Sequence, residues 1–451
     1  MQKKKLIIAA TASIFSLGVA VFAVAQTYDE QYAKGYADNQ NYTITLNSTS
    51  GVQSKEGGLF HQIDVRNNKF DMIGWSDQGG NFGSIKKAAH GVDNFVYNGM
   101  IYNRSAINGF ESLKVTFTGG SLRYVFTDFL MENMDFNGAT LTSGTAVEVP
   151  AGKAYFIVYN ESETPTNIDS LEITYACDGT IESQMLFNKD TTLGYARSGS
   201  KTVTKEDSYI TLENNPTKYN NNYSQGKHEG HANNDTWYRW NGRYFTASEE
   251  LGTEFTFGMT IIGEYSSMTD ATQRFHYNVW PQFSYGNSDD EPWAQTYIGN
   301  DNYEPLGGAN RLHPSDDYAK NAFEGRFFTE YDYINNKWQF ADPDTTKIPD
   351  THVDLTMREA YERYNLPFWF IKFDAYLTTV GEDENIPVAD IYINNMLITE
   401  QLELFENYDN VNTPSIHIKT LPMHLVNYGV DAEGNPDNSY TGSFTYPRLI
   451  K

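Results

Sequence analysis

The chain of 451 residues contains a single cysteine, Cys177. One cysteine excludes an intramolecular disulfide and a metal cluster built from several thiolates. Stability must therefore come from packed apolar cores, which a chain of this length can form. Because Cys177 follows a predicted strand and has no basic cluster beside it in sequence, we expect a buried structural thiol and not a nucleophile.

Basic residues are scarce relative to acidic ones. The sequence has 33 Lys and Arg against 58 Asp and Glu, which gives a formal net charge of -25. Binding to phosphate depends on Lys and Arg that displace counterions. Nucleic acids and anionic membrane surfaces are therefore poor partners, and neutral or cationic ligands remain.

Long apolar runs are absent after the first 25 residues. Lys3, Lys4 and Lys5 precede an apolar run over Leu6–Val24, and small residues up to Ala25 precede a polar segment. This pattern predicts a signal peptide over residues 1–25, with a membrane anchor as the alternative. We expect a secreted, extracellular protein of bacterial type that does not insert into a membrane, with a polar arm over residues 26–40. Removal of the three lysines changes the formal charge from -25 to -28.

Several catalytic signatures are missing from the sequence. It has no Gly-x-Ser-x-Gly elbow and no Glu-x-Asp-x-x-Glu motif of laminarinase type. Gly79-Gly80 is not followed by the Lys-Ser/Thr of a phosphate loop, and His228 and His231 are one residue too close for a His-Glu-x-x-His zinc helix. A non-catalytic role is favoured, although a catalytic site assembled from scattered residues stays open.

Aromatic residues are abundant, with 32 Tyr, 27 Phe and 7 Trp. They occur in short alternating segments separated by Gly, Asn and Asp, which is typical of antiparallel β-sandwiches. The sequence predicts an all-β protein of two jelly-roll-like sandwiches in tandem, over residues 41–180 and 181–451. One short helix is expected in the second, because Thr356 and Glu359 have capping-box spacing and Pro367 ends the pattern. The clearest predicted strands are Tyr42–Leu46, Leu113–Phe117, Leu122–Phe126, Tyr155–Tyr159, Ser170–Tyr175 and Phe255–Ile262.

The segment Leu366–Ile398 predicts a β-hairpin. Trp369, Ile371 and Phe373 alternate with Lys372 and Asp374, which places apolar and polar residues on opposite faces. After a polar turn, the second strand ends in Tyr392-Ile393-Asn394-Asn395. This ending resembles the x-Tyr-x-Asn-Gly hairpin of concanavalin-A-like and laminin-G-like jelly-roll domains, with Asn395 in place of the glycine. The resemblance implies a jelly-roll fold for the C-terminal half.

The richest candidate for a binding site is the stretch Trp280–Tyr303, where aromatic residues alternate with Asp, Asn and Gln. Sugar rings offer flat C–H faces that stack on aromatic rings, and hydroxyl groups that exchange hydrogen bonds with carboxylates and amides. We expect aromatic platforms and hydroxyl partners here, with the alternative that some of the aromatics belong to the core. The predicted ligand-binding residues are Trp280, Trp293, Tyr297, Tyr303, Asp289, Asp290, Asn300 and Asp301, with Trp240 from a second aromatic cluster.

The sequence thus predicts a lectin-like protein that binds a polysaccharide or other glycan without catalysis and without a required cofactor. Calcium is a secondary expectation, because sandwich lectins often carry it and Asn287–Glu291 and Asp342–Asp344 offer hard oxygen ligands. Two alternatives stay open. One is a jelly-roll glycoside hydrolase or polysaccharide lyase, and the other is a surface adhesion protein with a protein partner.

Overall fold

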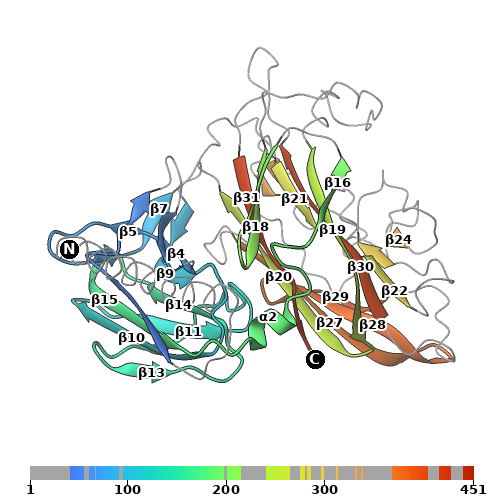
Figure 1. Cartoon of the computed structure of the whole chain (residues 1–451), viewed down its shortest axis with the longest axis horizontal. Coiled ribbons are helices and arrows are strands. Elements are labelled where there is room, and N and C mark those ends of the chain that lie inside the picture. The colour runs from blue at the N-terminus through green and yellow to red at the C-terminus, as the bar shows by residue number, and fades with distance from the viewer. Residues whose placement is uncertain are drawn as a thin grey trace, which may run out of the picture.

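The computed structural model describes residues 41–54, 60–66, 68–90, 95–197, 201–214, 240–264, 275–279, 282–285, 296–298, 311–312, 331–332, 337–338, 368–404, 416–427 and 440–451. Strands are the main regular structure of these residues, joined by turns and loops, and all the strand pairs but one are antiparallel. The predicted all-β class is confirmed (Figure 1). The helix predicted near Thr356 lies outside the described residues.

Residues 42–175 form two sheets. Sheet I has the order β13 (Ala146–Glu148), β10 (Phe110–Thr118), β15 (Thr166–Tyr175), β6 (Gly83–Ile85) and β5 (Trp75–Ser76), and β1 (Tyr42–Asn47) also pairs with β15. Sheet II has the order β12 (Ala139–Thr140), β11 (Arg123–Thr127), β14 (Tyr155–Asn160), β9 (Gly99–Asn103), β4 (Asn68–Ile73), β3 (His61–Val65) and β2 (Gln53–Ser54). A separate hairpin joins β7 (Ala88–His90) and β8 (Phe95–Tyr97).

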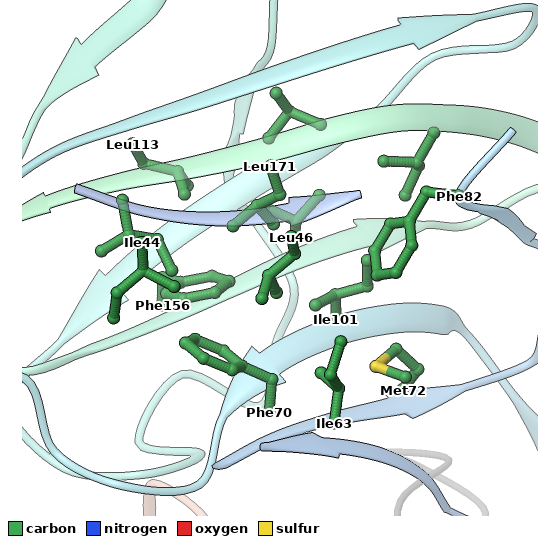
Figure 2. Close-up of a cluster of buried hydrophobic side chains, with 14 of the residues drawn as sticks. Ile44, Leu46, Ile63, Phe70, Met72, Phe82, Ile101, Leu113, Phe156 and Leu171 are labelled. Carbon is green, nitrogen blue, oxygen red and sulfur yellow. The ribbon is translucent and has the colours of Figure 1, made fainter. Parts of the chain in front are cut away.

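Sheets I and II pack face to face around one apolar core. Alternate residues of the strands point inward, as the period of two along a strand requires. Figure 2 shows these side chains interdigitating between the layers. The core includes Ile44, Leu46, Phe70, Met72, Ile101, Leu113, Phe156, Leu171 and Ile173, all at most 1 % exposed. Cys177 belongs to the same cluster, which confirms the buried thiol.

Residues 193–450 form two further large sheets. Sheet III has the order β17 (Lys201–Lys205), β18 (Tyr209–Asn214), β31 (Tyr440–Thr445), β20 (Phe255–Glu264), β27 (Phe368–Val380), β28 (Asp383–Ile393) and β29 (Met396–Glu403), with β32 (Arg448–Ile450) paired to β20. Sheet IV has the order β16 (Leu193–Arg197), β19 (Trp240–Gly252), β30 (Ile416–Asn427), β22 (Gln282–Tyr285), β23 (Thr296–Ile298) and β24 (Arg311–Leu312), with β21 (Phe275–Val279) paired to β30. A small hairpin joins β25 (Tyr331–Asp332) and β26 (Lys337–Trp338).

The inner faces of sheets III and IV meet in a second core, where β18 and β31 lie against β19 and β30. Sheet III contributes Phe257, Met259 and Ile261, and sheet IV contributes Leu421 and Met423, all buried. This is a second pair of packed antiparallel sheets.

The predicted hairpin of β27 and β28 is present, with Phe373 opposite Ile391 and Asp374 opposite Asp390. The turn into β29 uses Asn394 and Asn395, both with positive φ (49° and 63°), a conformation that asparagine tolerates better than most residues. The buried Asn394 side chain accepts a hydrogen bond from the Phe370 N–H (2.8 Å) and donates one to the Phe368 carbonyl (2.9 Å). The asparagine at this position therefore ties the turn to β27.

The outer face of sheet II is also buried, because sheet III covers it. The Tyr102 ring meets Phe368 of β27 edge-on at 5.5 Å, and Phe129 packs against Phe370 at 5.2 Å. Thr260 Oγ1 of β20 donates a hydrogen bond to the Leu130 carbonyl. The described residues thus form four layers in the order I, II, III, IV.

The link between the two pairs of sheets is α2 (Thr180–Gln184), the helix of the described residues. It lies between the two pairs in Figure 1. The Ile181 N–H donates to the Asn108 side chain (2.6 Å), and the Gln184 side chain accepts from Arg448 Nε (2.8 Å). One short helix therefore contacts both halves of the molecule.

Candidate functional site

Most of the predicted ligand-binding residues lie outside the described residues. These are Trp280, Asp289, Asp290, Trp293, Asn300, Asp301 and Tyr303. Two of the predicted residues are placed. Trp240 begins β19, and Tyr297 is the middle residue of β23, so both belong to sheet IV.

Strand β30 fixes the positions of its neighbours in sheet IV. On one side it pairs with β19, with Trp240 opposite Val426. On its other side it pairs first with β21 and then with β22. Val279 of β21 lies opposite Met423, and Gln282 of β22 lies opposite Thr420. Each step is three residues, so β21 and β22 pair with β30 in one continuous register.

The two faces of sheet IV follow from the burial of β30. Leu421 and Met423 are fully buried and belong to the inner face. Because successive residues of a strand alternate between faces, Thr420, Pro422, His424 and Val426 belong to the outer face. Their register partners on neighbouring strands share that face.

Four transverse rows of register partners make up this part of the outer face, which we call the row face. The rows are Trp240, Val426 and His276; Arg197, Gly242, His424 and Asn278; Gly194, Tyr244 and Pro422; and Thr246, Thr420, Gln282, Tyr297 and Arg311. The register therefore brings Trp240 and Tyr297, which are far apart in sequence, to one face of one sheet. They are not neighbours, because six positions along β30 correspond to about 20 Å.

Sequence reasoning missed a polar and aromatic cluster on the outer face of the β27–β28 hairpin. Asp374 and Asp390 are cross-strand partners, a like-charge arrangement that is destabilising unless donors compensate it. Asp374 accepts hydrogen bonds from Thr256 Oγ1 and is paired with Lys372 Nζ, both at 2.9 Å. Lys372 Nζ also lies 4.4 Å from the centre of the Tyr392 ring.

The second carboxylate of this cluster has its own donors. Asp390 Oδ1 accepts from Tyr376 Oη (3.2 Å) and from the Gln401 N–H (2.8 Å). Burial, together with the Asp390 charge, raises the pKa of the Tyr376 and Tyr392 hydroxyls. The Tyr376 hydroxyl therefore stays protonated at neutral pH, as its hydrogen bond to Asp390 requires. The register of the predicted hairpin would have revealed this cluster, since the polar residues of both strands fall on one face.

A buried ion pair lies at the junction of sheets II and III. Arg104 Nε donates to Asp71 Oδ2, with side chains 1 % and 0 % exposed. The same carboxylate accepts from Tyr102 Oη (2.9 Å) and Gln62 Nε2 (3.1 Å). Arg104 Nη1 reaches Ser443 Oγ of β31 at 3.2 Å. Because the two charges pair with each other inside the protein, we assign the pair a structural role.

Within the described residues, no group of three or more His, Cys, Asp or Glu side chains is arranged to hold a metal ion. The two segments expected to bind calcium, 287–291 and 342–344, lie outside those residues. Among the described helices, none is long and apolar enough to cross a membrane.

No family model matches the chain, and no curated protein matches it.

Proposed function

We propose that the protein is a secreted, non-catalytic glycan-binding protein whose binding site is on sheet IV. The observation that carries the proposal is the register of β30, which assigns Trp240 and Tyr297 to the same outer face. Their meeting on one face supports a common site.

The composition of the row face fits a sugar ligand. Its aromatic positions are Trp240, Tyr244 and Tyr297, and amide positions lie between them at Asn278 and Gln282. Aromatic rings accommodate the C–H faces of sugars, and amides both donate and accept hydrogen bonds with hydroxyl groups.

The proposal is tested by retention of the mature protein on a panel of immobilised polysaccharides. We expect Trp240→Ala and Tyr297→Ala each to weaken binding about tenfold or more, equivalent to about 1.4 kcal/mol. Trp293→Ala tests the adjoining segment of the chain in the same way. Tyr331→Ala is the matched control, because β25 and β26 form a hairpin separate from sheet IV.

Two results would contradict the proposal. One is that no glycan retains the parent protein. The other is that a glycan retains the parent and both sheet IV variants equally. Binding to a protein that survives excess free sugar would instead favour the adhesion alternative.

The enzyme alternative is favoured by one observation, the cross-strand pair Asp374 and Asp390. Directly opposite residues have Cβ atoms about 5 Å apart, and retaining glycosidases place two carboxyl groups about 5 to 5.5 Å apart. Against it, Asp374 is paired with the Lys372 ammonium group, and Asp390 accepts from the Tyr376 hydroxyl and the Gln401 N–H, so both carboxylates are engaged within the protein. Release of reducing ends or unsaturated sugars that Asp390→Asn abolishes would establish the enzyme.

A further inference from the structure

The outer face of sheet III is buried over only part of its area. Phe368 and Phe370 of β27 pack against sheet II. Further along the same face, the side chains of Lys372 and Asp374 are 24 % and 32 % exposed. With their neighbours on the β27–β28 hairpin they form a partly exposed group that we call the hairpin cluster: Lys372, Asp374, Tyr376, Asp390 and Tyr392.

Strand β29 has a β-bulge beside this cluster, where Asp390 of β28 lies opposite two residues, Glu400 and Gln401. Gln401 has a positive φ of 51°, a conformation that residues other than glycine rarely adopt, and its N–H donates to Asp390 Oδ1 (2.8 Å). Bulges and unfavourable backbone conformations occur often next to functional sites, where they direct a side chain. Here the distortion fixes the orientation of Asp390.

The hairpin cluster has hydrogen-bonding atoms that the described residues do not use. Asp390 accepts both of its described hydrogen bonds at Oδ1, and no donor among the described residues reaches Oδ2. Lys372 Nζ carries three N–H donors, and its one described acceptor is Asp374 Oδ2 at 2.9 Å. The Tyr392 hydroxyl has no hydrogen-bond partner in the described part of the chain. A carboxylate oxygen, an ammonium group and a phenol hydroxyl therefore remain for a ligand.

A sugar residue fits this set of groups. Each sugar hydroxyl can donate and accept a hydrogen bond, so neighbouring hydroxyls can donate to Asp390 Oδ2 and accept from Lys372 Nζ. These two residues are diagonal neighbours across the hairpin, about 7 to 8 Å apart, which places both within reach of one sugar ring. The partly exposed rings of Tyr376 and Tyr392 supply apolar surface for its C–H groups.

The charges of the hairpin cluster favour an uncharged ligand. An anion would meet the carboxylates of Asp374 and Asp390, and a cation would meet the ammonium group of Lys372. A neutral ligand rich in hydroxyl groups can instead form charge-assisted hydrogen bonds with groups of both signs.

We propose that the hairpin cluster is a second binding site of the protein and that its ligand is a neutral sugar residue of a glycan. The cluster lies on the outer face of sheet III, and the row face lies on the outer face of sheet IV, so one sugar residue cannot contact both. The inference goes beyond the site proposed on sheet IV and depends on different residues.

The test is native electrophoresis of the mature protein through gels that each contain one soluble neutral polysaccharide: β-glucan, xylan, galactomannan or dextran. A gel without polysaccharide gives the reference migration. We expect a Trp240→Ala variant, which lacks the central aromatic side chain of the row face, still to be retarded in at least one gel. In this background Lys372→Met should raise the dissociation constant about tenfold, because it removes a charged donor, and Tyr392→Phe about two- to fivefold, because it removes a neutral hydroxyl.

Lys114→Met is the matched control in the same background. Lys114 is also paired with a carboxylate, Glu172 at 2.8 Å, and is 35 % exposed, but it lies on sheet I. Its replacement should leave the retardation unchanged. Melting temperatures of the variants should stay within a few degrees of the parent, which separates lost binding from lost folding.

The outcomes separate this inference from the proposed function. If Trp240→Ala alone abolishes the retardation in every gel, the second site is overturned while the site on sheet IV stands. If Trp240→Ala changes nothing and Lys372→Met removes the retardation, the second site stands and the proposal for sheet IV fails. Absence of retardation in all four gels overturns both. Equal effects of Lys372→Met and Lys114→Met would also overturn the second site, since they would not depend on the hairpin cluster.

Discussion

The outer faces of sheets III and IV belong to the same pair of packed sheets but have opposite character. Sheet III presents Phe368, Phe370 and Thr260, all buried against sheet II. The row face of sheet IV instead combines aromatic and amide positions with the apolar positions Val426 and Pro422. One outer face of this sheet pair is thus used in part for packing inside the molecule, and the other is the face on which we propose the ligand of Trp240 and Tyr297 to bind.

The largest expected effect comes from breaking the buried Arg104–Asp71 ion pair, which lies where sheets II and III meet. Arg104→Ala leaves the Asp71 carboxylate buried without its main cationic partner, so we expect a loss of about 3 to 5 kcal/mol in the free energy of unfolding. Chemical denaturation followed by circular dichroism measures it. Lys114→Ala removes a pair that is about one-third exposed, with Glu172, and should cost less than about 1 kcal/mol. Equal losses would mean that burial does not set the cost.

A second test compares one aromatic side chain from each face. Phe370→Ala removes a fully buried ring that packs on Phe129, with an expected cost of about 3 to 5 kcal/mol. For Tyr297→Ala on the row face we expect about 0.5 kcal/mol or less, the usual range of surface substitutions. Chemical denaturation of the two variants measures whether Phe370→Ala costs more free energy of unfolding than Tyr297→Ala. A large loss for Tyr297→Ala would show that the row face is a packing surface and would break the comparison.

The close approach of sheets II and III can be tested at Gly258 of β20. An added Cβ would lie 2.6 Å from the Phe129 ring, so Gly258→Ala should cost about 1 to 3 kcal/mol through overpacking. Gly79→Ala is the control, because nothing lies within 4 Å of its added Cβ. Thermal unfolding measures both. Pairing Gly258→Ala with Phe129→Leu should recover part of the loss if the ring is the obstacle.

The smallest expected effect is a pH dependence of stability that comes from Glu182 of α2, the helix that links the two pairs of sheets. Burial, opposed by an Asn108 hydrogen bond and assisted by Asp207 and Asp178, raises the pKa of Glu182 from 4.5 to about 7. The folded protein therefore holds this proton more tightly than the unfolded chain. The resulting stability is complete below about pH 4.5 and is lost as the pH rises through about 7.

Glu182→Gln should remove that pH dependence and stabilise the protein at pH 8 relative to the parent. Because the side chain is partly open to solvent, we expect about 1 kcal/mol or less. Denaturant midpoints at pH 4, 6 and 8 measure the difference between parent and variant. A constant difference across these values would contradict the assignment to Glu182.

Much of the fold could be predicted from alternation along the strands. The hairpin of β27 and β28 and the faces of Ile371 and Phe373 were predicted correctly, because a period of two is a local property of the sequence. The burial of Phe368 and Phe370 on the opposite face could not be predicted in this way. Alternation divides a strand into two faces but does not say whether water or another sheet covers the second one.

The candidate site could also be predicted only in part, because its residues come together through pairing between distant strands. Residue chemistry pointed to Trp240 and Tyr297, and their common face emerged only from pairing through β30, a strand more than 100 residues beyond either of them. The Asp374 and Asp390 pair was within reach of sequence reasoning, since hairpin register is local. The rows of the row face were not, because their members come from strands far apart in the sequence.

The four-layer arrangement also has a consequence for the order of folding. All strands of sheets I and II lie within residues 42–175, so this pair can close early in synthesis, before sheet III has been made. Its outer face, with Tyr102 and Tyr155, is covered only when β27, β31 and Arg448 have been made, 193 residues (368 − 175) to 273 residues (448 − 175) after the end of β15. During that interval the nascent chain exposes a large apolar surface. We expect this to be the stage at which the protein most needs protection from aggregation, and truncation before β27 to yield an insoluble first half.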